Sequence, residues 1–212
     1  MATAIQSFTS YQESEAWTWE HLALTRARPL VGAVALMAEV EAFRRDLLVA
    51  KGKGAVVRKD VAEMRARLAV AKPARGLWEA KNGPGRLMDI ELMAEMAALL
   101  TGSPARGVER QIEAGRKGGI LSDSDATGLL EAYRLMWRLQ AGTRLITDGA
   151  LDPAKLGEGA CAFLLRETGE ASAVALSDRL ESVAGLAEAV IEAQMPEGAQ
   201  GARDGETGSA VE

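Results

Sequence analysis

The stretch GLWEAKNGPGRLMDIELMAEM, from Gly76 to Met96, is where the sequence departs most clearly from its general pattern. An extended-looking piece leads to Lys81 and then to the flexible run Asn82 to Gly85. Asp89 and Glu91 follow in the first turns of an expected helix. This juxtaposition of a lysine, a glycine turn and two carboxylates makes the stretch the first candidate for a functional site.

On both sides of this stretch the spacing of apolar residues is helical. The expected helices cover residues 10–28, 34–51, 57–72, 87–100, 108–116, 123–147, 158–167 and 172–194. Ser10 with Glu13 has the pattern of a capping box at the start of the first helix. No hairpin signal and no repeat of fixed period is present. The sequence therefore predicts an all-α helical bundle of about seven to eight helices, followed by a disordered tail from Pro196 onward.

The composition favours a cytoplasmic protein. Apolar residues make up 48% of the 212 residues and aromatic residues only 4%, as in helices packed through small and aliphatic side chains. The single cysteine, Cys161, cannot form an internal disulfide and is interpreted as a small core residue. The N-terminus lacks the features of a signal peptide, and no apolar run is long enough to cross a membrane.

Charge is unevenly distributed. Residues 26–86 contain fourteen Lys and Arg against six Asp and Glu, although the whole chain has a net charge of −5. Such a segment can meet phosphates or an acidic partner, or it can be a helix pair with a solvated basic face. Aromatic residues are not interleaved with the bases, so no nucleic-acid partner is expected.

The residue types around Lys81 allow a functional and a structural interpretation. Gly83 and Gly85 permit close approach to a ligand or positive φ angles. Lys81 supplies a charge for a phosphate, whereas Asp89 and Glu91 could hold a metal ion or orient a lysine. Alternatively, the two acids only stabilise the first turns of their helix. The sequence contains no Walker A loop, no dinucleotide fingerprint and no Cys/His cluster with the spacing of metal ligands.

Five blocks of the sequence resemble the C-terminal end of the bifunctional glutamine synthetase adenylyltransferase/adenylyl-removing enzymes. The blocks are YQESEAWTWEHLALTRAR (Tyr11–Arg28), VAEMRARL (Val61–Leu68), KNGPGRLMDIELMAE (Lys81–Glu95), AYRLMWRLQ (Ala132–Gln140) and LGEGACAFLLR (Leu156–Arg166). The first and third are the most specific to that family.

The third block matches the family pattern at seven positions: Lys81, Gly83, Gly85, Leu87, Asp89, Ile90 and Glu91. It departs at Arg86, where the family usually has a second glycine, at Leu92 in place of phenylalanine, and at Glu95 in place of glutamine. The resemblance implies that Lys81, Gly83, Gly85, Asp89 and Glu91 form a wall near the nucleotide, or support the catalytic acids from behind.

The resemblance also implies a function. The family transfers AMP from ATP to a tyrosine of glutamine synthetase with Mg²⁺, in nitrogen regulation, and also removes it. Its catalytic aspartates belong to a nucleotidyltransferase domain that is expected to be missing here. Residues 1–28 would be a terminal helix belonging with that domain, 29–194 a C-terminal helical domain and 195–212 a tail. On this interpretation the chain alone is inactive, and no catalytic or metal-binding residue is assigned to it.

Two other interpretations remain open. The chain could be a regulatory module that binds glutamine or the PII nitrogen-signalling protein, with Arg58, Lys59, Arg65 and Arg67 as the surface to test. It could also be a structural remnant with an exposed apolar surface. The account in which the first helix belongs with the missing domain makes a further prediction. That helix carries more bulky apolar residues than one face can bury, so we expect at least one of Trp17 and Trp19 to be exposed. His21 is expected to be packed rather than catalytic.

Overall fold

The computed structural model describes residues 3–53, 55–149 and 151–195, which form an all-α protein with no β-strand in these ranges. The elements are α1 (Ile5–Ser14), α2 (Thr18–Arg26), α3 (Val34–Lys51), α4 (Ala55–Ala71), α5 (Leu87–Leu100), α6 (Val108–Lys117), α7 (Asp123–Ile146), the 3-10 turn η1 (Pro153–Lys155), α8 (Glu158–Thr168) and α9 (Ala173–Ala193). The predicted fold class is confirmed.

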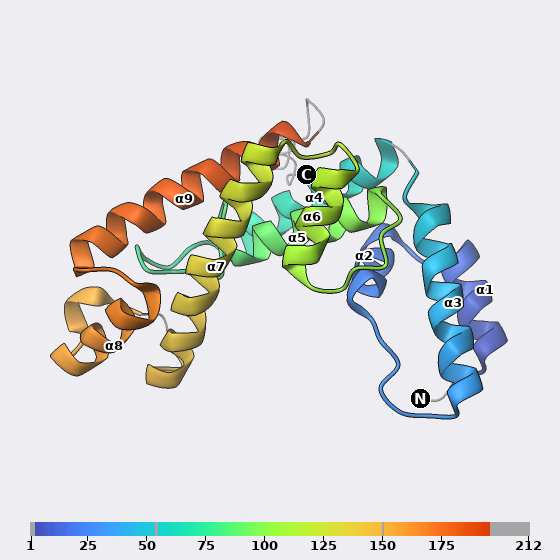
Figure 1. The fold of residues 1–212 in the computed structure, drawn as a ribbon, viewed down its shortest axis with the longest axis horizontal. Coiled ribbons are helices and arrows are strands. Elements are labelled where there is room, and N and C mark those ends of the chain that lie inside the picture. The colour runs from blue at the N-terminus through green and yellow to red at the C-terminus, as the bar shows by residue number, and fades with distance from the viewer. Residues whose placement is uncertain (1–2, 54, 150, 196–212) are drawn as a thin grey trace, which may run out of the picture.

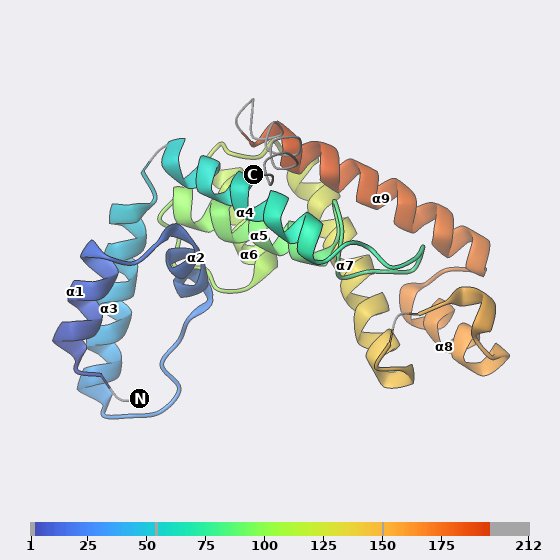
Figure 2. The same cartoon turned by 180° about the vertical axis from the view of Figure 1, so that it is seen from behind.

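The helices form an arch (Figure 1). Its middle consists of α5 with α2, α4 and α6 packed around it. One end is the pair α1 and α3, and the other is formed by α7, α8 and α9, as the reverse view in Figure 2 also shows. The start of α2 therefore belongs to the middle of the arch, whereas the loop before α5 reaches from the middle toward α9.

Helix α5 is central because its sequence, LMDIELMAEMAALL, is apolar almost all round. Ten of its fourteen residues are buried, so it needs neighbours on every side. Helix α7 is the longest of the described helices, as predicted, and begins with a capping box in which the Ser122 hydroxyl accepts the N–H of Asp125.

The predicted helix ends agree with the structure to within two residues, except in the first helix. A single helix at 10–28 is wrong, because the chain breaks before Trp17 and forms α1 and α2. The Glu20 carboxylate accepts the backbone N–H of Trp17 and the hydroxyl of Tyr11, which caps the start of α2. Ser10 lies inside α1 and is not an N-cap. The described residues accordingly contain nine α-helices rather than seven or eight.

Three smaller expectations concern single residues and the tail. His21 is buried, and its Nε2 lies 3.0 Å from the carbonyl oxygen of Gln12, which confirms a packing role. Cys161 is half-buried against the core. The tail expected from residue 196 lies outside the described residues. In the ranges described, no helix combines the length and hydropathy needed to cross a membrane.

Candidate functional site

The loop before α5 is fixed by its own hydrogen bonds. The Glu79 carboxylate accepts the backbone N–H groups of Lys81 and Asn82 at 2.9 and 3.1 Å. The Arg86 guanidinium donates to the Glu79 carbonyl oxygen. Trp78 is 1% exposed, and its indole N–H donates to the Ser177 hydroxyl of α9 at 2.9 Å. The loop is therefore an ordered connection between α4, α5 and α9.

Gly85 shows why this loop contains glycine. Its φ is +63°, in the left-handed region, and a Cβ placed on it would lie 2.0 Å from the carbonyl oxygen of Ala184 in α9. Only glycine fits such a position without displacing the helix backbone. The close approach that the sequence suggested is thus an approach to α9.

Asp89 is buried and fully engaged. Its carboxylate forms a bidentate pair with Arg65 of α4, at 2.7 and 2.9 Å, and also accepts the backbone N–H of Gly85 at 2.8 Å. Arg65 reaches Glu192 of α9 at 3.5 Å. We call the set Arg65, Trp78, Gly85 and Asp89 the loop clamp, because it joins α4, α5 and α9 through the loop.

Glu91 lies on a different side of α5 from Asp89. Two residues correspond to about 200° around a helix, so the two carboxylates point apart. Glu91 and Glu95 both face Arg26 of α2, at 3.7 and 3.2 Å. Burial raises the pKa of the Glu95 carboxyl, although the Arg26 guanidinium lowers it. The structure thus brings Glu91 together with Glu95 and Arg26, and not with Asp89.

This separation bears on the Mg²⁺ that the family resemblance implies. Asp89 already binds a guanidinium, and Glu91 is too far around the helix to share a metal ion with it. No group of three or more His, Cys, Asp or Glu in the described residues could hold a metal ion. The residues of the Lys81–Glu91 stretch therefore do not fit a metal site by themselves, and we derive no step through a metal here.

The remaining predicted residues are less enclosed. Lys81 is exposed, and among the described residues no ion pair joins it to either carboxylate. Gly83 has a φ of +113° and packs beside Ala74 and Arg86. Of the five predicted residues, Lys81 alone presents an exposed side chain.

The four bases considered as a regulatory surface do not form one open patch. Arg58 donates to the Gln194 carbonyl at 2.7 Å, and Arg65 belongs to the loop clamp. Lys59 and Arg67 pair with Glu63 at 4.0 and 3.5 Å, with all three side chains substantially exposed. Two of the four bases are thus used in joining helices.

A second candidate site lies between the start of α2 and α4. Trp17 is 64% and Trp19 47% exposed, which confirms the expected exposure. Their rings are stacked, with centroids 5.0 Å apart and planes at 13°. Two positions apart on the single helix predicted at 10–28, the rings would point to different faces; they stack instead because Trp17 is in extended conformation before the first turn of α2.

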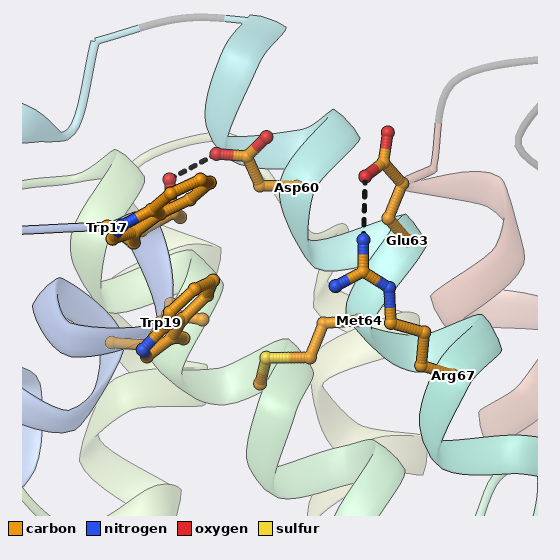
Figure 3. Close-up of a pocket in the computed structure, with 8 residues that line it drawn as sticks. Trp17, Trp19, Asp60, Glu63, Met64 and Arg67 are labelled. Atoms are coloured by element: carbon orange, nitrogen blue, oxygen red, sulfur yellow. Dashed lines mark hydrogen bonds and ion pairs between the residues drawn. The ribbon is translucent and has the colours of Figure 1, made fainter.

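Figure 3 shows the pocket beside these rings. Its volume is about 90 Å³. The lining residues are Trp17, Thr18, Trp19 and Leu22 from the α2 region and Asp60, Glu63, Met64 and Arg67 from α4. We call it the tryptophan pocket. The Thr18 hydroxyl donates to the Asp60 carboxylate and ties the two helices together at its edge.

Sequence reasoning missed the partners in both places. Nothing local marks Arg65 as the partner of Asp89, 24 positions away, or Asp60 as the neighbour of Thr18. The exposed tryptophans were predictable from excess apolar surface, but the pocket depends on how α2 and α4 meet.

Comparisons with known proteins find two family models that match different ranges of the chain. The family model described as glutamate-ammonia ligase adenylyltransferase matches residues 1–43, and the model described as GlnD PII-uridylyltransferase matches residues 56–153. Each description names a nucleotidyl-transferring enzyme, and each model matches less than half of the chain.

Over most of its length the chain resembles one segment of the bifunctional glutamine synthetase adenylyltransferase/adenylyl-removing enzymes. It is 41% identical to the protein of that name from Rhizobium meliloti (strain 1021) over 75% of its own length. The identity is 37% over 79% of this chain for the Mesorhizobium japonicum protein and 35% over 78% for that of Rhodopseudomonas palustris (strain HaA2). The chain spans about 17% of the length of these relatives.

Proposed function

We propose that this chain is the helical part of a glutamine synthetase adenylyltransferase and supports its nucleotidyltransferase active site. The observation that carries the proposal is the 41% identity to the Rhizobium meliloti relative over 167 residues. Adenylylation and deadenylylation of glutamine synthetase, in the cytoplasm and with ATP and Mg²⁺, are the activity that this assignment gives to the whole enzyme.

In this proposal the chain contributes no catalytic carboxylate. Asp89 is occupied by Arg65, so its role is to hold α4, α5 and α9 in a fixed arrangement. Lys81 and Gly83 lie in the loop that the clamp holds, and Glu91 lies on the side of α5 that faces α2. We propose that these residues support, from behind, the wall that faces the nucleotide.

The exposed rings of Trp17 and Trp19, which we call the tryptophan surface, support a docking role. Two large indole rings exposed side by side forgo roughly 1.5–3 kcal/mol of burial each. Exposed aromatic surface of this kind marks contact sites in proteins. We propose that Trp17 and Trp19 contact the nucleotidyltransferase domain, and that residues 1–28 belong structurally with it.

A chimaera tests this function. The segment of the Rhizobium meliloti relative that matches this chain is replaced by residues 1–192, and AMP transfer to glutamine synthetase is measured. The proposal expects transfer close to that of the parent enzyme. Introducing Asp89→Asn should reduce transfer in parallel with folded enzyme. Unchanged transfer by that variant would remove Asp89 from the proposed support, and an inactive but folded chimaera would contradict the proposal itself.

The match of residues 56–153 to a PII-uridylyltransferase model favours one alternative, a regulatory module that binds PII protein or glutamine. Calorimetric titration of the chain with PII protein, glutamine and ATP separates the two. Binding of PII or glutamine by the isolated chain, lost in Lys59→Ala/Arg67→Ala, would favour the regulatory module.

A further inference from the structure

The tryptophan pocket has an aromatic side and an acidic side. On the aromatic side the rings of Trp17 and Trp19 are stacked on each other and both residues are exposed, and Met64 lies beside Trp19 (Figure 3). Indole is the best of the protein side chains at attracting a cation to its face. This side of the pocket therefore suits a flat, positively charged group.

The acidic side is formed by two carboxylates from consecutive turns of α4. Asp60 makes no ion pair within the described part of the chain, and its one hydrogen bond comes from the neutral hydroxyl of Thr18. Glu63 is shared between Lys59 and Arg67, whose side chains are 71% and 76% exposed. Exposed pairs along one helix are weak, so an incoming cation can displace them.

We propose that the tryptophan pocket receives the guanidinium group of an arginine presented by a protein partner. The planar guanidinium would stack on an indole face while its N–H groups pair with the Asp60 carboxylate. An anion would meet this unpaired carboxylate, and a lysine ammonium could not stack, so arginine fits best. The inference rests on the proposed docking function, because it names the group by which a docked partner is held.

Nuclear magnetic resonance of the indole N–H groups tests this directly. The ¹⁵N-labelled chain is titrated with the capped peptide Gly-Arg-Gly and with the same peptide containing citrulline, which has nearly the same shape but no charge. The signals are assigned with Trp→Phe variants. We expect the signals of Trp17 and Trp19 to shift with the arginine peptide and that of Trp137, an exposed tryptophan on α7, to stay unchanged. Binding of the citrulline peptide should be about tenfold weaker.

Two matched variants examine the carboxylate. Asp60→Asn should weaken binding of the arginine peptide several-fold, whereas Asp46→Asn, an exposed acid on α3, should leave it unchanged. Equal binding of both peptides, or undiminished binding by a folded Asp60→Asn chain, would overturn the proposal. A lower thermal midpoint with undiminished binding would show that Asp60 serves only to join α2 and α4.

The result of the peptide titration can be distinguished from the result of the AMP-transfer assay on the chimaera. The peptide titration uses only this chain, so its failure leaves AMP transfer by the chimaera unaffected. Conversely, an inactive chimaera together with selective arginine binding would keep the pocket and reject the proposed enzyme.

Discussion

The loop clamp and the tryptophan pocket both carry side chains suited to binding ligands, but the structure uses them differently. In the loop clamp, Asp89 and Gly85 are buried and directed at α4 and α9. In the tryptophan pocket, two aromatic rings are exposed, and Asp60 beside them makes no ion pair with any residue that the structure describes. The stretch with the more conspicuous motif is thus the more structural of the two.

The difference teaches that residue types alone do not identify a binding site. A glycine turn followed by two acids looks like a site for phosphate or metal. Here, however, Gly85 allows close packing against α9, and Asp89 pairs with the half-buried Arg65. The side chains that we propose for binding a partner lie where α2 and α4 meet at the surface, and no short sequence motif marks that place.

The largest expected contrast is between tryptophans. Trp78→Ala should lower the free energy of unfolding by about 4 kcal/mol, because it empties a fully buried site and frees the Ser177 hydroxyl. Trp17→Ala should cost less than about 1 kcal/mol, because the ring is mostly in solvent. Urea unfolding followed by circular dichroism measures both, and equal losses would abolish the comparison.

Gly85→Ala should be the next most damaging change. The added methyl group meets the Ala184 carbonyl, and the left-handed backbone disfavours alanine, so we expect a loss of about 3 kcal/mol. Gly185→Ala in α9 is the control, since nothing lies near its Cβ and alanine favours the helix. If Gly85→Ala unfolds at the same urea concentration as the unchanged chain, the loop does not touch α9 as described.

The third prediction concerns the ion pair of the loop clamp. Asp89→Ala should cost about 2 kcal/mol, because it leaves Arg65 partly buried without its partner. Asp123→Ala removes the exposed partner of Arg116 and should cost below about 1 kcal/mol. Combining Asp89→Ala with Arg65→Met should restore part of the loss, and strictly additive losses would argue against the pairing.

The smallest expected effect is on the other side of α5 and depends on pH. Burial raises the pKa of Glu95, so folding is disfavoured by its ionisation and stability falls as pH rises through that pKa. Glu95→Gln should therefore be slightly more stable than the unchanged chain at pH 7, and the gain should vanish below pH ~4.5, where the unfolded carboxyl is also protonated. Thermal midpoints from pH 4 to 8 measure this, and a gain that grows toward low pH would reverse the sign.

Most of the fold was predictable because helical periodicity and glycine or proline stops are local signals. The range of α5 was predicted to the residue, since an apolar run flanked by Gly85 and Gly102 leaves little choice. The break at Trp17 was not, because it depends on Glu20 accepting both the Trp17 N–H and the Tyr11 hydroxyl. That arrangement competes with a continuous helix only once α1 folds back toward α3.

The site was predictable only in part. The sequence indicated that Lys81 to Glu91 is a special stretch and that the tryptophans are exposed. It could not indicate that Asp89 would meet Arg65, or that Asp60 would lie beside Trp17 and Trp19, because both pairings are tertiary. Carboxylates two positions apart on a helix could, however, have been excluded as a joint metal site from helical geometry alone.

The central claim is that the tryptophan surface serves contact with the rest of the enzyme whereas the loop clamp serves folding. The most direct test is AMP transfer by the chimaera carrying Trp17→Ala and Trp19→Ala, measured per folded molecule and well below its thermal midpoint. The account predicts at least a tenfold loss of transfer with a midpoint close to that of the unchanged chimaera. Full transfer by this double variant would contradict it.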